Sequence, residues 1–262
     1  MNDIAMAALG SALLLIGTSL GSAFVFFVKG NDISPKLNQI FLGFAGGVML
    51  AASFFSLLLP AIETSDQVLP GVAIGAIGVL LGAGFLWLID ILTPHLHVKE
   101  NKEEGALFNS SKKTTKMFLA VTIHNIPEGL SVGIAYGVAL ATGLPGGIMA
   151  ATSLAIGIAL QNVPEGAIVS LPMKAETSKP KAFFFGVGSG AVEPIASVIG
   201  IFLAFALTPV LPYALAFAAG AMLYVIAEDM IPDMKGDPSS HFGVWSFLFG
   251  FLLMMVLDVV LG

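Results

Sequence analysis

Residues 117–129 read MFLAVTIHNIPEG and residues 153–166 read SLAIGIALQNVPEG, so two successive apolar stretches end in nearly the same polar hexapeptide. Because an α-helix turns by about 100° per residue, the first, second and fifth residues of each hexapeptide share one helix face. Each proline removes a backbone hydrogen bond in mid-helix and favours a kink. The repeat therefore predicts two neighbouring helices that turn polar faces toward a common site.

The composition of the whole chain is that of a membrane protein. Hydrophobic residues make up 56% of the 262 residues and charged residues only 11%. One helical crossing needs about 20 apolar residues, which predicts eight spans at about 5–28, 40–60, 70–92, 117–142, 147–172, 182–206, 209–230 and 242–261. The first span is too long for a cleavable signal, and its leader carries Asp3 instead of basic residues. We therefore predict an all-α polytopic membrane protein with a single transmembrane domain over residues 1–262.

Positive charge marks one side of the membrane. All eleven basic residues are lysines, and each lies in a segment that follows an odd-numbered span: Lys29, Lys36, Lys99, Lys102, Lys112, Lys113, Lys116, Lys174, Lys179, Lys181 and Lys235. Basic residues concentrate on the cytoplasmic side of membrane proteins. Both termini are therefore predicted to face outward from the inner (plasma) membrane of the cell, and residues 95–116 to form a cytoplasmic loop between the third and fourth spans.

Several function classes lack their sequence signatures here. The chain has no cysteine, which excludes a disulfide framework and a thiolate metal site. It has no P-loop for ATP hydrolysis and no His-Glu-x-x-His motif of a metalloprotease. We therefore expect no enzyme and no catalytic cofactor. The expected partners are divalent metal ions and the lipid bilayer, with a homodimer left open and nucleic acid excluded.

Three carboxylates lie near the middle of predicted spans, those of Glu128, Glu165 and Glu193, with His124 nearby. An ionised side chain costs about 2.5–3.5 kcal/mol at mid-bilayer on insertion scales, and like charges at close range bind protons or recruit a cation. Imidazole nitrogen combined with carboxylate oxygen suits Zn²⁺, Cd²⁺, Fe²⁺ or Mn²⁺ better than Ca²⁺ or Mg²⁺. A proton-coupled cation antiporter that uses the buried carboxylates alone is the alternative, and it gives the histidine and the amides no role.

The paired hexapeptides and the Glu193-Pro194 dipeptide resemble the ZIP (Zrt-, Irt-like protein) metal transporters, and most closely the bacterial branch similar to GufA proteins. The resemblance covers the whole chain. It implies inverted three-helix repeats, spans 1–3 and 6–8, around the central pair of spans 4 and 5. It also implies secondary transport of divalent transition metals into the cytoplasm, with Zn²⁺ or Cd²⁺ bound as the transported substrate.

The same resemblance implies a metal site at mid-membrane with two adjacent positions. The first position takes residues from both hexapeptides: His124, Glu128, Gln161 and Glu165. Met49 is either a further ligand or a packing residue. The second position takes Asn125, Asn162 and Glu193, with Glu128 and Glu165 bridging. Where this chain has Asn162, members of the family can have an acid, so one negative charge is missing and a mononuclear site is the alternative.

Further ionisable residues are candidates for the transport path. They are Glu228 and Asp229 at the inner end of the seventh span, Glu63 and Asp258 near the outer surface, and His95 and His97 in the cytoplasmic loop. The inner pair fits a release route or a solvated helix end, and the outer pair a cation-concentrating mouth or a solvated rim. The two histidines are candidates for weak metal capture. Asp90 is expected to be interfacial rather than ligating.

Overall fold

Eight helices long and apolar enough to cross a membrane lie in the part of the chain that the computed structural model describes, residues 2–28, 34–63, 68–92, 95–96, 103–104, 113–206, 210–235 and 240–261. They cover Asp3–Phe27, Pro35–Glu63, Pro70–Ile91, Phe118–Thr142, Gly147–Glu176, Lys179–Ala206, Leu211–Met234 and Phe242–Leu261. The predicted eight spans and the all-α class are thereby confirmed.

Four spans are continuous helices and four are interrupted. The continuous ones are α5 (Val68–Leu92), α6 (Lys113–Thr142), α7 (Gly147–Glu176) and α12 (Phe242–Leu261). Span 1 contains α1 (Asp3–Ser22) and α2 (Phe24–Phe27), and span 6 contains α8 (Lys179–Gly190) and α9 (Val192–Ala206). Span 2 contains α3 (Pro35–Ala51), the π-helix η1 (Ala52–Leu58) and α4 (Leu59–Glu63). Span 7 contains α10 (Leu211–Val225), the π-helix η3 (Ile226–Met230) and α11 (Ile231–Met234).

Two short strands lie within the predicted 95–116 loop. Strand β1 (His95–Leu96) pairs antiparallel with β2 (Glu103–Glu104), with His95 opposite Glu104. The side chain of His95 and all of His97 lie outside the described residues, so the predicted metal capture by this pair stays a prediction.

The hexapeptide prolines do not interrupt their helices. Pro127 lies inside α6 and Pro164 inside α7, and both helices continue to their far ends. A break occurs instead beside Glu193, where Pro194 has no N–H to bond to the carbonyl of Gly190. Helix α8 accordingly ends at Gly190, and Glu193 lies in the first turn of α9.

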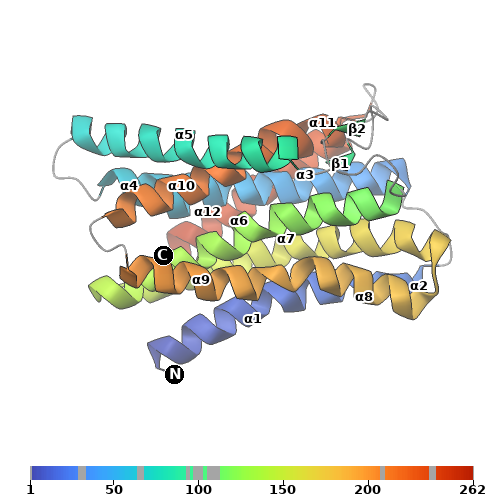
Figure 1. The fold of residues 1–262 in the computed structure, drawn as a ribbon, viewed down its shortest axis with the longest axis horizontal. Coiled ribbons are helices and arrows are strands. Elements are labelled where there is room, and N and C mark those ends of the chain that lie inside the picture. The colour runs from blue at the N-terminus through green and yellow to red at the C-terminus, as the bar shows by residue number, and fades with distance from the viewer. Residues whose placement is uncertain are drawn as a thin grey trace.

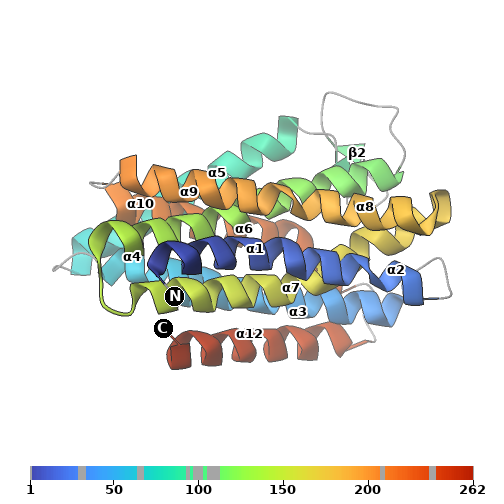
Figure 2. The ribbon, with the colours of Figure 1, turned by 90° about the horizontal axis from the view of Figure 1, so that it is seen from below.

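A short turn brings the two hexapeptide helices together. Gly143 and Gly146 between α6 and α7 have φ angles of +62° and +81°. Glycine adopts this left-handed region without the steric cost that a Cβ atom brings. The turn therefore reverses the chain within a few residues, and α7 returns alongside α6 (Figures 1 and 2).

The contacts between helices follow the inverted repeat that the family resemblance implies. The most extensive contacts join α1 to α7, α6 to α9, α3 to α12 and α5 to α10. The repeat exchanges spans 1, 2 and 3 with spans 6, 7 and 8, and span 4 with span 5. This exchange turns the contact of α1 with α7 into that of α9 with α6, and the contact of α3 with α12 into that of α10 with α5. The interruptions obey the same exchange, with breaks in spans 1 and 6 and π-helices in spans 2 and 7. This agreement supports the repeat architecture that the family resemblance implies.

We call α1, α2 and α6 to α9 the motif group, and the remaining spans the flanking group. Figure 1 shows the flanking group above the motif group, with the N- and C-termini toward one end of the bundle and β1 and β2 at the other. Termini at the same end are the necessary result of an even number of spans.

The last residue of the first hexapeptide, Gly129, permits α6 to contact the backbone of α9. A methyl group at Gly129 would lie 2.7 Å from the Cα atom of Glu193, closer than side-chain carbons approach backbone. Small residues at such contacts let membrane helices pack tightly. Gly129 therefore fixes the distance between the hexapeptide and Glu193.

We predict that Gly129→Ala lowers the free energy of unfolding in detergent by about 1–3 kcal/mol, because the added methyl overpacks a backbone contact. Gly84→Ala on α5 is the control, since the described residues place no atom of another helix within 4 Å of a methyl there; it should gain about 0.5–1 kcal/mol from helix propensity. Thermal unfolding measures both, and equal stability of the two variants would contradict the close packing.

Candidate metal centre

Helices α6 and α7 turn their polar residues into the interior of the protein. Apart from His124, the polar residues of the hexapeptides and Glu193 of α9 expose 4% of their surface or less: Asn125, Glu128, Gln161, Asn162, Glu165 and Glu193. Burial of so many polar groups is costly unless each finds a partner. The partners of these groups therefore decide what the site can do.

The buried carboxylates repel one another. Glu128 interacts electrostatically with Glu165 and Glu193, and Glu165 with Glu193. His124 interacts electrostatically with Glu165. The structure thus brings the predicted acids and the histidine into one neighbourhood.

No three histidine, aspartate or glutamate side chains among the described residues converge closely enough to hold a metal ion. The predicted bridging by Glu128 and Glu165 therefore stays a prediction. Among the amides of the site, Gln161 has a side chain that interacts with Glu128 without forming a regular hydrogen bond.

Many polar atoms of the site have no hydrogen-bond partner among the described residues. They are Oδ1 of Asn125, both oxygens of Glu128, Oε1 and Nε2 of Gln161, Oδ1 of Asn162 and Oε1 of Glu165. Buried polar groups in proteins are nearly always paired, and a single unpaired one costs about 1–3 kcal/mol. Six unpartnered oxygens in one place form an electron-rich set whose natural complement is a cation.

Hydrogen bonds of the two asparagines fix the direction of their amide oxygens. Asn125 Nδ2 donates to the carbonyl oxygen of Ser189 at 2.8 Å, and Asn162 Nδ2 donates to the carbonyl oxygen of Leu14 at 3.2 Å. A carbonyl only accepts, so the NH₂ group must face it. The Oδ1 atom of each asparagine is thereby turned away from these partners.

Glu193 differs from the other two acids. Its Oε1 accepts a hydrogen bond from Thr18 Oγ1 of α1 at 3.0 Å, and its Oε2 accepts one from Asn162 Nδ2. The sequence reasoning did not find Thr18, which is 175 residues away from Glu193 and lies in an ordinary apolar helix. No local pattern signals such a contact.

A second polar cluster lies between the two helix groups. His124 Nε2 is 3.1 Å from Asp229 Oδ2, and η3 of the flanking group supplies that aspartate. Asp90 of α5 accepts a hydrogen bond from Tyr224 at 3.2 Å and also interacts electrostatically with His124. Asp90, expected to be merely interfacial, is therefore half-buried and hydrogen-bonded within the bundle.

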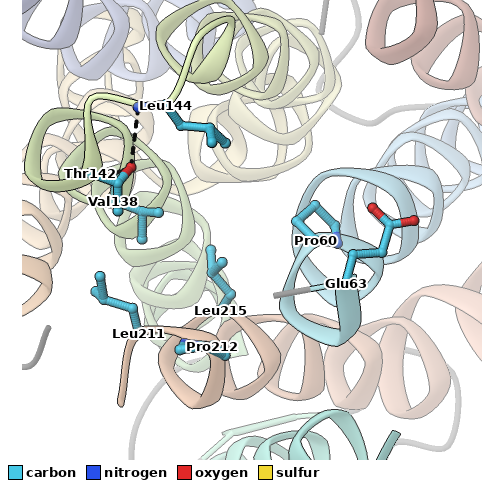
Figure 3. Close-up of a pocket in the computed structure, with 8 residues that line it drawn as sticks. All are labelled: Pro60, Glu63, Val138, Thr142, Leu144, Leu211, Pro212 and Leu215. Carbon is cyan, nitrogen blue, oxygen red and sulfur yellow. Dashed lines mark hydrogen bonds between the residues drawn. The ribbon is translucent and has the colours of Figure 1, made fainter. Parts of the chain in front are cut away.

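The outer candidates occupy the end of the bundle that holds the termini. Glu63 lies at the edge of a pocket of about 420 Å³, whose apolar walls include Val138, Leu144 and Leu215 (Figure 3). Asp258 accepts a hydrogen bond from Ser56 of η1 at 2.6 Å, which ties α12 to that π-helix. Asp258 is thus half-buried and hydrogen-bonded between helices, and its predicted role at the outer mouth stays a prediction.

Met49 is fully buried within the main hydrophobic cluster, together with Met222 and Met254. This position is typical of a packing residue, and the predicted thioether ligation is not tested by it.

The sequence of this chain is similar to those of known zinc transporters. Residues 117–258, which include both hexapeptides and Glu193, match the sequence profile of the ZIP zinc transporters. The zinc transporter ZIP11 of Xenopus tropicalis is 36% identical over 331 aligned positions, which cover 97% of this chain and 96% of that protein. The zinc transporter GufA of Myxococcus xanthus is 34% identical over 258 positions, covering 96% and 98%. The zinc transporter ZIPB of Bordetella bronchiseptica is 33% identical over 267 positions, covering 99% and 82%. This chain therefore belongs to the ZIP zinc transporter family.

Proposed function

We propose that this chain is a secondary transporter that carries divalent transition-metal ions, Zn²⁺ above all, across the cell's inner (plasma) membrane into the cytoplasm. The observation that carries the proposal is the set of unpartnered buried oxygens on α6 and α7. Its relatives are named zinc transporters, and its eight spans give the site a membrane setting.

The cation takes its ligands from the two hexapeptides. Glu128 and Glu165 supply negative charge, Gln161 supplies a neutral oxygen, and His124 supplies the nitrogen that favours Zn²⁺ and Cd²⁺. Two carboxylates neutralise one divalent ion, so the loaded site carries little net charge in a medium where charge is expensive.

Release to the cytoplasm begins at His124. Its Nε2 atom lies 3.1 Å from Asp229, and an ion that binds this nitrogen has to displace the aspartate. When the ion leaves, Asp229 binds the imidazole again. Asp229 and Glu228 also provide carboxylate ligands for the ion on the inner side. Because Asp229 belongs to the flanking group, loading and release alter a contact between the two helix groups.

Entry takes place at the end of the bundle that holds the termini. Glu63 at the edge of the 420 Å³ pocket raises the local cation concentration there. The lysines that follow odd-numbered spans support a cytoplasmic location for the opposite end. A membrane potential that is negative inside then favours entry of a divalent ion by about 4.6 kcal/mol per 100 mV.

We predict that Glu165→Ala and Glu128→Ala each lower radiotracer zinc uptake into proteoliposomes by at least about 100-fold, because even residues that merely support metal ligands contribute about 10- to 100-fold. Glu176→Ala, at the exposed cytoplasmic end of α7, is the matched control and keeps normal uptake. Uptake at the normal rate by well-folded Glu165→Ala protein would remove this carboxylate from the site.

His124→Ala is expected to lower the preference for Zn²⁺ and Cd²⁺ over Mn²⁺ by roughly tenfold, since a nitrogen ligand matters more to the former pair. Acidification should weaken uptake less in the variant than in the parent, because protons compete with the metal for the imidazole. Competitive uptake at two pH values measures both effects. Unchanged selectivity and pH dependence would mean that the ion is held by oxygen alone.

Gln161→Leu should separate stability from binding. Its amide forms no regular hydrogen bond with a described residue, so an apolar replacement raises the free energy of unfolding of the metal-free protein by about 1 kcal/mol. The stabilisation of the protein by added zinc is lost at the same time. Asn125→Leu, which leaves the Ser189 carbonyl without its donor, is the contrast and lowers the same free energy by about 1–3 kcal/mol. A loss of stability in both variants would show that Gln161 is a structural residue.

A further inference from the structure

The three buried acids of the site have unequal partners. Neither oxygen of Glu128 has a hydrogen-bond donor among the described residues, and Oε1 of Glu165 has none. Both oxygens of Glu193 have one, from Thr18 and from Asn162. Glu193 is therefore the one acid of the three whose charge is satisfied by the protein itself.

The Thr18 hydroxyl has a single hydrogen to donate. Two acceptors lie near it, Glu193 Oε1 at 3.0 Å and the Leu14 carbonyl at 3.3 Å. The carbonyl already accepts from Asn162 Nδ2 at 3.2 Å, and a bond to a carboxylate is the stronger of the two types. The Thr18 hydroxyl therefore donates its hydrogen bond to Glu193 Oε1.

The Asn162 amide takes the place that a cation would need. Its NH₂ group has two hydrogens, one for the Leu14 carbonyl and one for Glu193 Oε2. A metal ion that bridged Glu193 to the hexapeptides would meet the positive end of this amide dipole. The amide thus occupies the second position by hydrogen bonding.

The packing around Thr18 keeps its hydroxyl in place. A methyl group at Gly190 would lie 2.6 Å from the Thr18 side chain, and one at Gly166 would lie 2.9 Å from the backbone nitrogen of Ser22. Thr18 is therefore enclosed where α1 meets α7 and the end of α8. Glu193 itself lies in the first turn of α9, where the helix dipole stabilises negative charge.

We propose that Thr18 and Asn162 together satisfy the Glu193 carboxylate, so that the site holds one divalent cation per chain instead of two, with Thr18 as a positioning residue. The inference rests on the function proposed above and concerns whether its metal site is mononuclear or binuclear. Glu128 and Glu165 neutralise the single ion, whereas two ions would bring four positive charges to three carboxylates.

The test is the number of zinc ions bound by the purified full-length chain, measured by equilibrium dialysis against zinc salt alone, with uptake into proteoliposomes measured in parallel. We expect about one ion in the parent protein. Asn162→Asp adds a carboxylate and removes the donor that occupies the second position, so this variant should bind about two ions. Thr18→Val leaves Glu193 Oε1 without its donor while the Asn162 amide stays in place, so a second ion should bind there, but more weakly than in Asn162→Asp.

Two control variants separate positioning from packing. Thr18→Ser keeps the hydroxyl and should bind about one ion, as the parent does. Ser11→Ala removes a buried hydroxyl of α1 whose 2.7 Å hydrogen bond joins Ser197 on α9, without touching Glu193, and should also keep about one ion.

About two ions in the parent protein, or one ion in all four variants, overturns the inference while leaving the proposed transport intact. Zinc uptake that is absent from the folded parent protein overturns the proposed function and this inference with it. Where Thr18→Val does not fold, the parent protein and Asn162→Asp decide the question by themselves.

Discussion

Negative charge buried in a membrane bundle is the constraint on which this structure depends. Glu128, Glu165 and Glu193 are almost completely buried and interact with one another. In a medium of low dielectric, each charge needs a proton, a hydrogen-bond donor or a cation. Glu193 has donors from Thr18 and Asn162. The other two acids have oxygens without a hydrogen-bond partner among the described residues. In the proposed function, the transported cation binds these oxygens.

The continuous and the interrupted spans have different places in the repeat architecture. Spans 4 and 5 carry the hexapeptides and are continuous, although each contains a proline. The irregular turns lie in the repeats, as breaks at Ala23 and Ala191 and as π-helices in spans 2 and 7. A π-helix widens one turn and redirects its side chains, and η3 in this way supplies Asp229 to His124. The proposed ligands on α6 and α7 therefore lie on continuous helices, whereas the irregular turns lie in the neighbouring spans.

Hydropathy and one repeated motif predict most of this architecture, because membrane spans and polar hexapeptides are local features of the sequence. The eight spans and the burial of the hexapeptide residues follow from them. The remaining features depend on contacts between distant residues. Residues 52–58 read as an ordinary apolar stretch and form a π-helix, Thr18 meets Glu193 across 175 residues, and Asp90 finds Tyr224 from another span. Such partners become visible only when the helices are packed.

The histidine of the first hexapeptide connects the site to the boundary between the helix groups. An imidazole nitrogen that bonds to Asp229 at 3.1 Å is not available to a metal ion at the same time. In the proposed function, a bound ion therefore removes a contact between the motif and flanking groups, and the departing ion restores it. Asp229 and the ion alternate as partners of this nitrogen. One side chain thus links the occupancy of the site to the packing of the two groups.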